Sequence, residues 1–170
     1  MGKVNKISII FVFLVFTTAC GVAFAKGDLS ASVFVFHASS EGVAEIELAK
    51  LALQKSTKGD IKFYAETVIS DYTKLNNDVA EFARQKKLKI STHAELPDKA
   101  NKFVLKQREG DYFDDAFVDN QIKTHKRSIR LYRRASKSKD ADLASFASSK
   151  LPILEMHLLQ AQRIKNPFKE

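Results

Sequence analysis

The chain has 170 residues and a formal net charge of +8, with 28 Lys and Arg against 20 Asp and Glu. This length suits one domain, and the single cysteine excludes an internal disulfide framework. Because the lysines are scattered among acids and no binding motif is present, the composition predicts a solvated surface and no nucleic-acid partner. Weak attraction to anionic lipid headgroups or lipopolysaccharide is the alternative for such a basic chain.

Residues 1–25 have the three parts of a signal peptide. Lys3 and Lys6 form a charged start, residues 7–19 form an apolar run, and Ala-Phe-Ala at 23–25 offers small residues for cleavage. The apolar run is shorter than the stretch of about 20 residues that a transmembrane helix needs. The sequence therefore predicts export to the periplasm or cell envelope through a cleavable signal peptide.

Two processing sites compete in this segment. Cleavage after Ala25 leaves residues 26–170 as a single helical-bundle domain without cysteine, so its core alone must stabilise it. The alternative is lipidation at Cys20, since Thr-Thr-Ala-Cys faintly resembles a lipoprotein box. That box usually has leucine where Thr17 stands, and cleavage after Ala25 is therefore preferred to a lipid anchor.

Amphipathic helices account for the rest of the chain, because apolar residues recur every three or four positions. Four long helices are predicted over about 31–55, 61–87, 112–136 and 141–164, with a short helix over about 97–108. Asp60, Asp111 and Asp140 are predicted to cap the second, third and fourth long helices, and Gly110 to end the short one.

The lengths of the connections predict the topology. The first and second long helices are joined by a short link, as are the third and fourth, so each pair is predicted to form an antiparallel hairpin. The connection between the second and third is long enough to cross the length of a bundle. We therefore predict an all-α, ferritin-like four-helix bundle with one long crossover that carries a short helix.

Every long helix places a polar residue on a face that should be buried. These residues are Glu41, Glu45, Tyr72, His125 and His157, with Asp71 at the edge of its apolar stripe. One interpretation is a structural network in which Glu45 accepts hydrogen bonds from histidines on facing helices. The other is a metal site of Glu45, His125 and His157. The network is preferred, because the Glu-x-x-His signature of di-iron bundles is absent.

Pro152 lies inside the last helix, little more than one turn before His157. A proline cannot donate to the carbonyl of Ser148, so the helix is predicted to kink there, with Ser148 or Ser149 compensating locally. The kink would re-aim His157 toward the bundle axis. A bend that wraps the helix around its neighbours is the alternative.

A family resemblance is carried by the stretches EGVAEIELAKLALQKS, VISDYTKLNNDV, GDYFDDAFVDNQIKTHKRSI and LASFASSKLPILEMHLLQA. Their order and spacing resemble the secreted bacterial family catalogued as domain of unknown function 4142, over about residues 33–164. The resemblance implies a ferritin-like fold, a periplasmic or outer-membrane-associated setting and no established activity.

The resemblance also concerns single positions, and the family commonly has the same residue at Glu45, Asp71, His125, Pro152 and His157. Tyr72 departs from the family, which usually has histidine there. A phenol with a reference pKa near 10 is a poor ligand for divalent metals. This departure weakens a metal site in this chain and suits a hydrogen-bond network.

Two functions are compatible with these observations. The first is a non-enzymatic protein of the cell envelope, a structural or binding module, because no catalytic residue can be assigned and the mature chain lacks a cysteine nucleophile. The alternative is a metal-binding ferritin-like protein that holds a divalent metal through Glu45, His125 and His157. The sequence identifies neither a substrate nor a partner.

Overall fold

The structure, a computed structural model, describes residues 28–167, and within that range all regular elements are helices. These helices are α1 (Ala31–Lys55), α2 (Gly59–Gln85), α3 (Leu96–Lys106), α4 (Gly110–Ala135) and α5 (Ala141–Lys165). The predicted all-α class is confirmed, and the helix ends differ from the predicted ends by no more than two residues. The predicted signal peptide, together with Cys20, lies outside the described residues.

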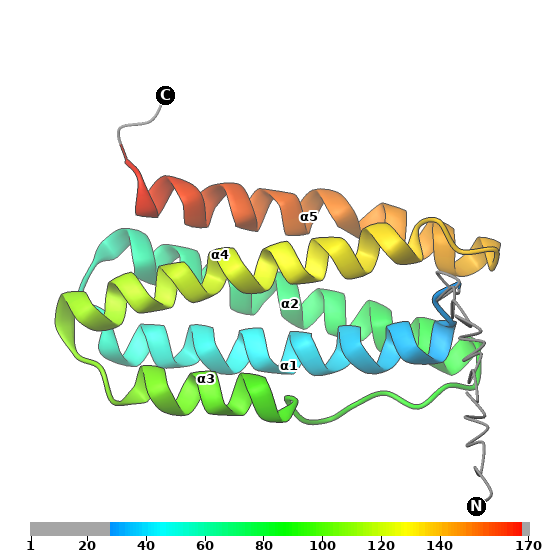
Figure 1. The fold of residues 1–170 in the computed structure, drawn as a ribbon, viewed down its shortest axis with the longest axis horizontal. Helices are drawn as coiled ribbons and strands as arrows, with labels where there is room; N and C mark the ends of the chain where they lie inside the picture. Colours follow the sequence, from blue (N-terminus) through cyan, green and yellow to red (C-terminus); the bar gives the residue numbers. More distant parts are fainter. Residues whose placement is uncertain (1–27, 168–170) are drawn as a thin grey trace, which may run out of the picture.

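Two antiparallel hairpins, α1 with α2 and α4 with α5, pack against each other (Figure 1). Contacts of α1 with α4 and of α2 with α5 close the four long helices into a bundle. The connection of residues 86–109 runs back along this bundle and carries α3 on its outer side, against α1 and α4. Because the connection crosses the length of the bundle, α2 and α4 run in the same direction (Figure 1).

Two neighbouring serines of α1 hold the extended part of this crossover. The hydroxyl of Ser39 accepts a hydrogen bond from the amide of Ser91 at 2.8 Å, and the hydroxyl of Ser40 donates to the carbonyl of His93 at 3.0 Å. Both serines are buried. Small polar side chains on α1 therefore satisfy backbone groups of a segment that has no helical or strand partner of its own.

One of the three predicted aspartate caps is confirmed. Asp140 is the N-cap of α5, and its carboxylate accepts from the amides of Asp142 and Leu143. The first helix begins in the same way, because the hydroxyl of Ser30 accepts from the amide of Val33 at 3.3 Å. Each cap satisfies a helical amide that has no partner inside its helix.

The other two predicted caps are wrong by one turn or less. Lys58 is the N-cap of α2, which places Asp60 in the first turn, where it accepts from the amide of Ile61 at 2.8 Å. Glu109 is the N-cap of α4, and Asp111 again lies in the first turn. An acid in the first turn still stabilises the helix through its dipole. Each aspartate therefore marks the start of its helix, although it lies just after the N-cap. Gly110, predicted to end the short helix, instead begins α4 with a φ of +53°.

The predicted apolar stripes form the core of the bundle. The stripe of α1 is buried along its whole length and consists of Phe34, Ala38, Glu41, Glu45, Leu48 and Ala52. The stripe of α2 is equally buried and consists of Ile61, Ala65, Val68, Tyr72, Leu75, Val79 and Phe82. Large rings pack between helices, for example Phe34 against Tyr132 with centroids 4.9 Å apart. In the described part of the chain, no helix is both long and apolar enough to cross a membrane.

Gly42 permits close approach of α1 and α2. A Cβ atom at this position would lie 1.8 Å from the Oδ1 atom of Asn76, a contact that real side chains cannot make. Asn76 therefore packs directly over the backbone of α1. Gly42 stands between Glu41 and Glu45 in sequence, so this contact fixes the depth at which both glutamates enter the bundle.

Helix α5 continues through Pro152 and ends only at Lys165. The hydroxyl of Ser149 donates to the carbonyl of Phe146 at 2.8 Å, so it does not take over the carbonyl that Pro152 leaves free. Pro152 itself is exposed, whereas His157 is buried. The kink at Pro152 stays a prediction.

Candidate functional site

Five polar residues singled out in the sequence lie at the centre of the bundle, and we call them the central polar cluster. The cluster consists of Glu45 on α1, Asp71 and Tyr72 on α2, His125 on α4 and His157 on α5. Glu45, Tyr72, His125 and His157 are between 0 and 2 % exposed. Only the side chain of Asp71 reaches solvent, with 18 % exposure.

The two histidines meet edge to face. Their ring centroids are 5.3 Å apart and their planes are at 89°. Tyr72 lies against both rings: it stacks on His157 with centroids 5.7 Å apart, and its hydroxyl lies 3.4 Å from Nε2 of His125. A side chain of α2 thus links the histidines of α4 and α5.

The partners of His125 define its tautomer in the neutral ring. Its Nδ1 atom lies 2.9 Å from the carbonyl oxygen of Gln121. A carbonyl can only accept, so Nδ1 carries the proton. Nε2 is then left with its lone pair and accepts a long hydrogen bond from the hydroxyl of Tyr72.

His157 is oriented by Asp71. Its Nε2 atom lies 3.0 Å from Oδ2 of Asp71, and because a carboxylate accepts, Nε2 is the donor. Burial first, and then the proximity of His125, lower the pKa of His157 to about 4, against the opposing effect of Asp71. At neutral pH this contact is therefore a hydrogen bond from an uncharged ring. The Nδ1 atom of His157 has no hydrogen-bond partner within residues 28–167.

Glu45 is satisfied by an amide and not by a histidine. The Nε2 atom of Gln121 donates to Oε2 of Glu45 at 2.8 Å, and the hydroxyl of Tyr64 donates to Oε1 of Gln121 at 3.0 Å. The expectation that Glu45 accepts from the histidines is wrong, because Gln121 lies one turn before His125 on α4 and takes that position. Tyr64 and Gln121 belong to the site, although the sequence analysis assigned neither to it.

A second buried group, which we call the crossover network, joins α1, α3 and α4. Arg127 donates to Glu41 and to Asp98, each at 2.9 Å, and the hydroxyl of Ser128 donates to Glu41 at 2.7 Å. Burial raises the pKa of Glu41, while the hydrogen bond from Ser128 and the charge of Arg127 oppose the rise. The network fixes α3 to the bundle through Asp98.

The residues of the central polar cluster do not fit a metal ion in this arrangement. No group of three or more His, Cys, Asp or Glu side chains in the described ranges is placed to hold one. Glu45, both ring nitrogens of His125 and Nε2 of His157 are directed to protein partners, as described above. Burial raises the pKa of Tyr72 well above its ordinary value, so its phenol stays protonated. The alternative prediction of a metal site at Glu45, His125 and His157 is therefore not supported by the geometry.

Comparison with known proteins identifies one family. The model of the family described as a domain of unknown function (DUF4142) matches residues 21–164. The match covers all five helices except the last residue of α5. The searches of curated proteins and of solved structures each returned no match.

Proposed function

The chain belongs to the DUF4142 family, whose description assigns no activity. We propose that it is an exported cell-envelope protein that acts as a structural or binding module. The observation that carries this proposal is that Glu45 and His125 are both held by protein partners. Glu45, the most buried carboxylate of the described residues, accepts from Gln121, and His125 is held at both ring nitrogens. A site that prepares these groups for a substrate would leave them open to a cavity instead.

The surface grooves support the same conclusion. The largest of four described grooves has a volume of about 580 Å³ and lies between the end of α2 and the start of α5. None of the four is lined by Glu45, Tyr72, His125 or His157. The buried polar residues therefore stabilise the bundle, and a partner would bind at the surface.

Metal analysis tests the proposal against its main alternative. The protein is purified from the envelope without a histidine tag, its metal content is measured, and its melting temperature is recorded with and without Zn²⁺, Mn²⁺ and Fe²⁺. We expect no bound metal and no rise in melting temperature. A rise that is lost in both His125→Ala and His157→Ala would establish the metal site and refute the structural role of the cluster.

The location in the envelope has a separate test. Mass spectrometry of the purified protein is expected to find Lys26 as the first residue, in agreement with cleavage after Ala25. A diacylated Cys20 would place the protein on a membrane by a lipid anchor. An intact Met1 would contradict export.

We also propose that the bundle is ferritin-like. Two antiparallel hairpins with a single crossover along the bundle support this classification. An experimental structure checks it, and a tight turn between α2 and an antiparallel α4 would contradict it.

A further inference from the structure

Helix α3 exposes its large apolar side chains and buries a polar one. Leu96, Phe103 and Val104 are 80, 67 and 53 % exposed, while Asp98 and Leu105 are the buried residues of the helix. Leu96 and Phe103 are two turns apart and so lie on one outward face. We call Leu96, Phe103 and Val104 the α3 ridge. An apolar face of this kind, on a helix already fixed to the bundle, marks a surface that contacts something else.

Basic side chains flank the α3 ridge. Lys99, Lys102 and Lys106 follow it along α3. Within residues 28–167, only Lys102 of these three pairs with an acid, Glu47, at 2.9 Å. The one acid within α3 is Asp98, which is buried and bound by Arg127. The outward face of α3 is therefore apolar at its centre and positive at its edge.

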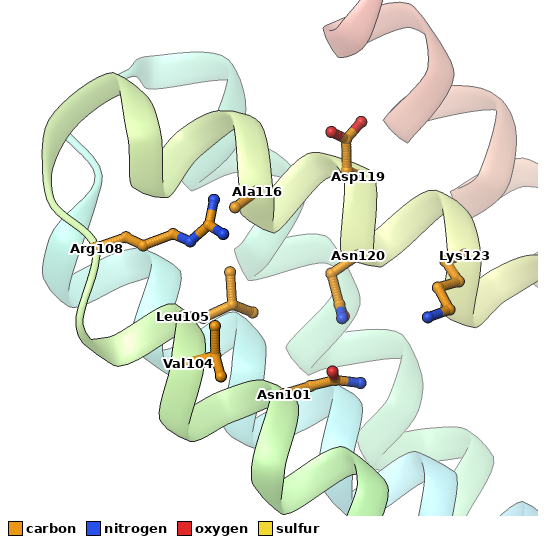
Figure 2. Close-up of a pocket in the computed structure, with 8 residues that line it drawn as sticks. All are labelled: Asn101, Val104, Leu105, Arg108, Ala116, Asp119, Asn120 and Lys123. Atoms are coloured by element: carbon orange, nitrogen blue, oxygen red, sulfur yellow. The ribbon is translucent and has the colours of Figure 1, made fainter.

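Lys102 and Lys106 line a groove on the α1 side of α3, and a second groove, between α3 and α4, lies on the other side of the helix (Figure 2). The second groove has a volume of about 320 Å³, and Arg108 and Lys123 approach it from its two ends. Neither cation has an ion-pair partner among residues 28–167. Asp119, the one acid of the lining, points away from the groove in Figure 2 and binds Lys165 at 3.1 Å. A cation thus lies at each end of a groove that is large enough for a phosphate group.

We propose that the α3 ridge and this groove form a docking surface for an anionic phospholipid bilayer. A bilayer presents phosphates above an apolar layer, and the surface presents cations beside apolar side chains. Leu96, Phe103 and Val104 enter the interface, while Arg108 and Lys123 bind headgroup phosphates. A second copy of the chain is a poorer occupant, because the like charges of two such faces would repel. The proposal rests on export to the envelope, where membrane surfaces are available.

A tryptophan reporter tests the apolar contact. The chain has no tryptophan, so Phe103→Trp introduces a single fluorophore on the α3 ridge. Phe63→Trp is the matched control, because Phe63 on α2 is 68 % exposed and Phe103 is 67 % exposed. With vesicles of equal parts phosphatidylglycerol and phosphatidylcholine, the emission of Phe103→Trp shifts to the blue and that of Phe63→Trp does not. Equal shifts, or none in either variant, would overturn the proposal.

Charge variants test the headgroup contact by vesicle co-sedimentation. Arg108→Gln and Lys123→Gln each lower the affinity for the anionic vesicles roughly five-fold, since one cation near an anionic surface contributes about that factor. Lys62→Gln, at an exposed lysine of α2, leaves the affinity unchanged. Equal binding to vesicles of phosphatidylcholine alone, whose headgroups carry phosphate but no net charge, would contradict the role of the anionic surface charge.

Parallel measurements distinguish self-association of the chain and failure of export from failure of the docking surface. Analytical ultracentrifugation without lipid reports self-association, and a dimer that Phe103→Gln dissociates would overturn the proposal in favour of a second copy. The protein is taken from the envelope, and its first residue is established by mass spectrometry before vesicles are added. An unprocessed Met1 therefore refutes export, whereas a processed chain that ignores the vesicles refutes the docking surface alone.

Discussion

The crossover network and the central polar cluster use neighbouring turns of α1 in different ways. Glu41 is bound by a cation, Arg127, whose side chain is 37 % exposed. Glu45 is bound by a neutral amide, and the groups around it are at most 2 % exposed. Charge is paired with charge only where one partner reaches water, because a fully buried ion pair carries a large desolvation cost. Deeper in the bundle, uncharged donors replace the cation.

The largest effect is expected at the crossover network. Arg127→Met keeps the bulk of the side chain but leaves Glu41 and Asp98 buried without their cation, which costs about 3 kcal/mol of unfolding free energy. Arg133→Met is the matched control, since Arg133 is 62 % exposed and pairs with an exposed Glu155, and such pairs contribute less than about 1 kcal/mol. Urea unfolding measures both. Equal losses would show that the network adds nothing beyond a surface ion pair.

The next effect depends on pH and belongs to His157. Its folded pKa of about 4 lies below the ordinary value of 6.5, so the unfolded chain binds more protons between these values. This contribution to stability is present above pH 6.5 and is lost as the pH falls, by about 2 kcal/mol at pH 5. His157→Gln keeps the donor to Asp71 without titrating, so the stability of wild type relative to this variant falls over that range. His93→Gln, at an exposed histidine, is expected to match wild type throughout.

A loss of similar size is expected at Glu45. Glu45→Ala leaves the amide of Gln121 without an acceptor and opens a cavity, which together cost about 2 kcal/mol. Glu45→Gln retains a carbonyl oxygen for the same hydrogen bond and costs less than about 1 kcal/mol. Thermal unfolding at pH 7 compares the pair. If the glutamine variant loses as much as the alanine variant, the negative charge of Glu45 is required, and a hydrogen bond to a neutral acceptor is not enough.

The smallest effect is expected at Tyr72. The bond from its hydroxyl to Nε2 of His125 is long, at 3.4 Å, and Tyr72→Phe keeps the stacking on His157. The substitution is therefore expected to lower the free energy of unfolding by less than about 1 kcal/mol. Chemical denaturation of this variant beside Tyr64→Phe, which removes a 3.0 Å bond, sharpens the comparison. If Tyr72→Phe lowers the free energy of unfolding more than Tyr64→Phe does, the longer hydrogen bond is the stronger of the two, and the expectation is wrong.

Helical periodicity was sufficient to predict the helices and the inward direction of Glu45, His125 and His157. It could not predict partners across helices, because those depend on the relative heights of the helices in the bundle. Gln121 lies on the same face of α4 as His125, one turn away, and this spacing was the available signal for its role. No sequence pattern near Arg127 or Asp98 predicts their contact. Asp98 lies on the crossover, and the path of the crossover is set by the folded bundle.

The displaced helix starts have a similar cause. Asp60 and Asp111 both have the chemistry of an N-cap, and the sequence alone cannot separate that position from the first turn. In the structure, Asp111 makes a different contact. Its Oδ1 atom lies 2.7 Å from Nζ of Lys58, which is itself the N-cap of α2. An ion pair between two helix starts thus competes with the capping bond that Asp111 could have made.

Nitrogen-15 NMR of the histidine side chains tests most directly whether the two histidines of the central polar cluster are uncharged and directed to protein partners. At pH 7 the account predicts a proton on Nδ1 of His125 and on Nε2 of His157. His157 is expected to gain its second proton only near pH 4, and added Zn²⁺ to leave both spectra unchanged. A doubly protonated His157 at pH 7, or a Zn²⁺-induced shift of nitrogens in both rings, would contradict the account.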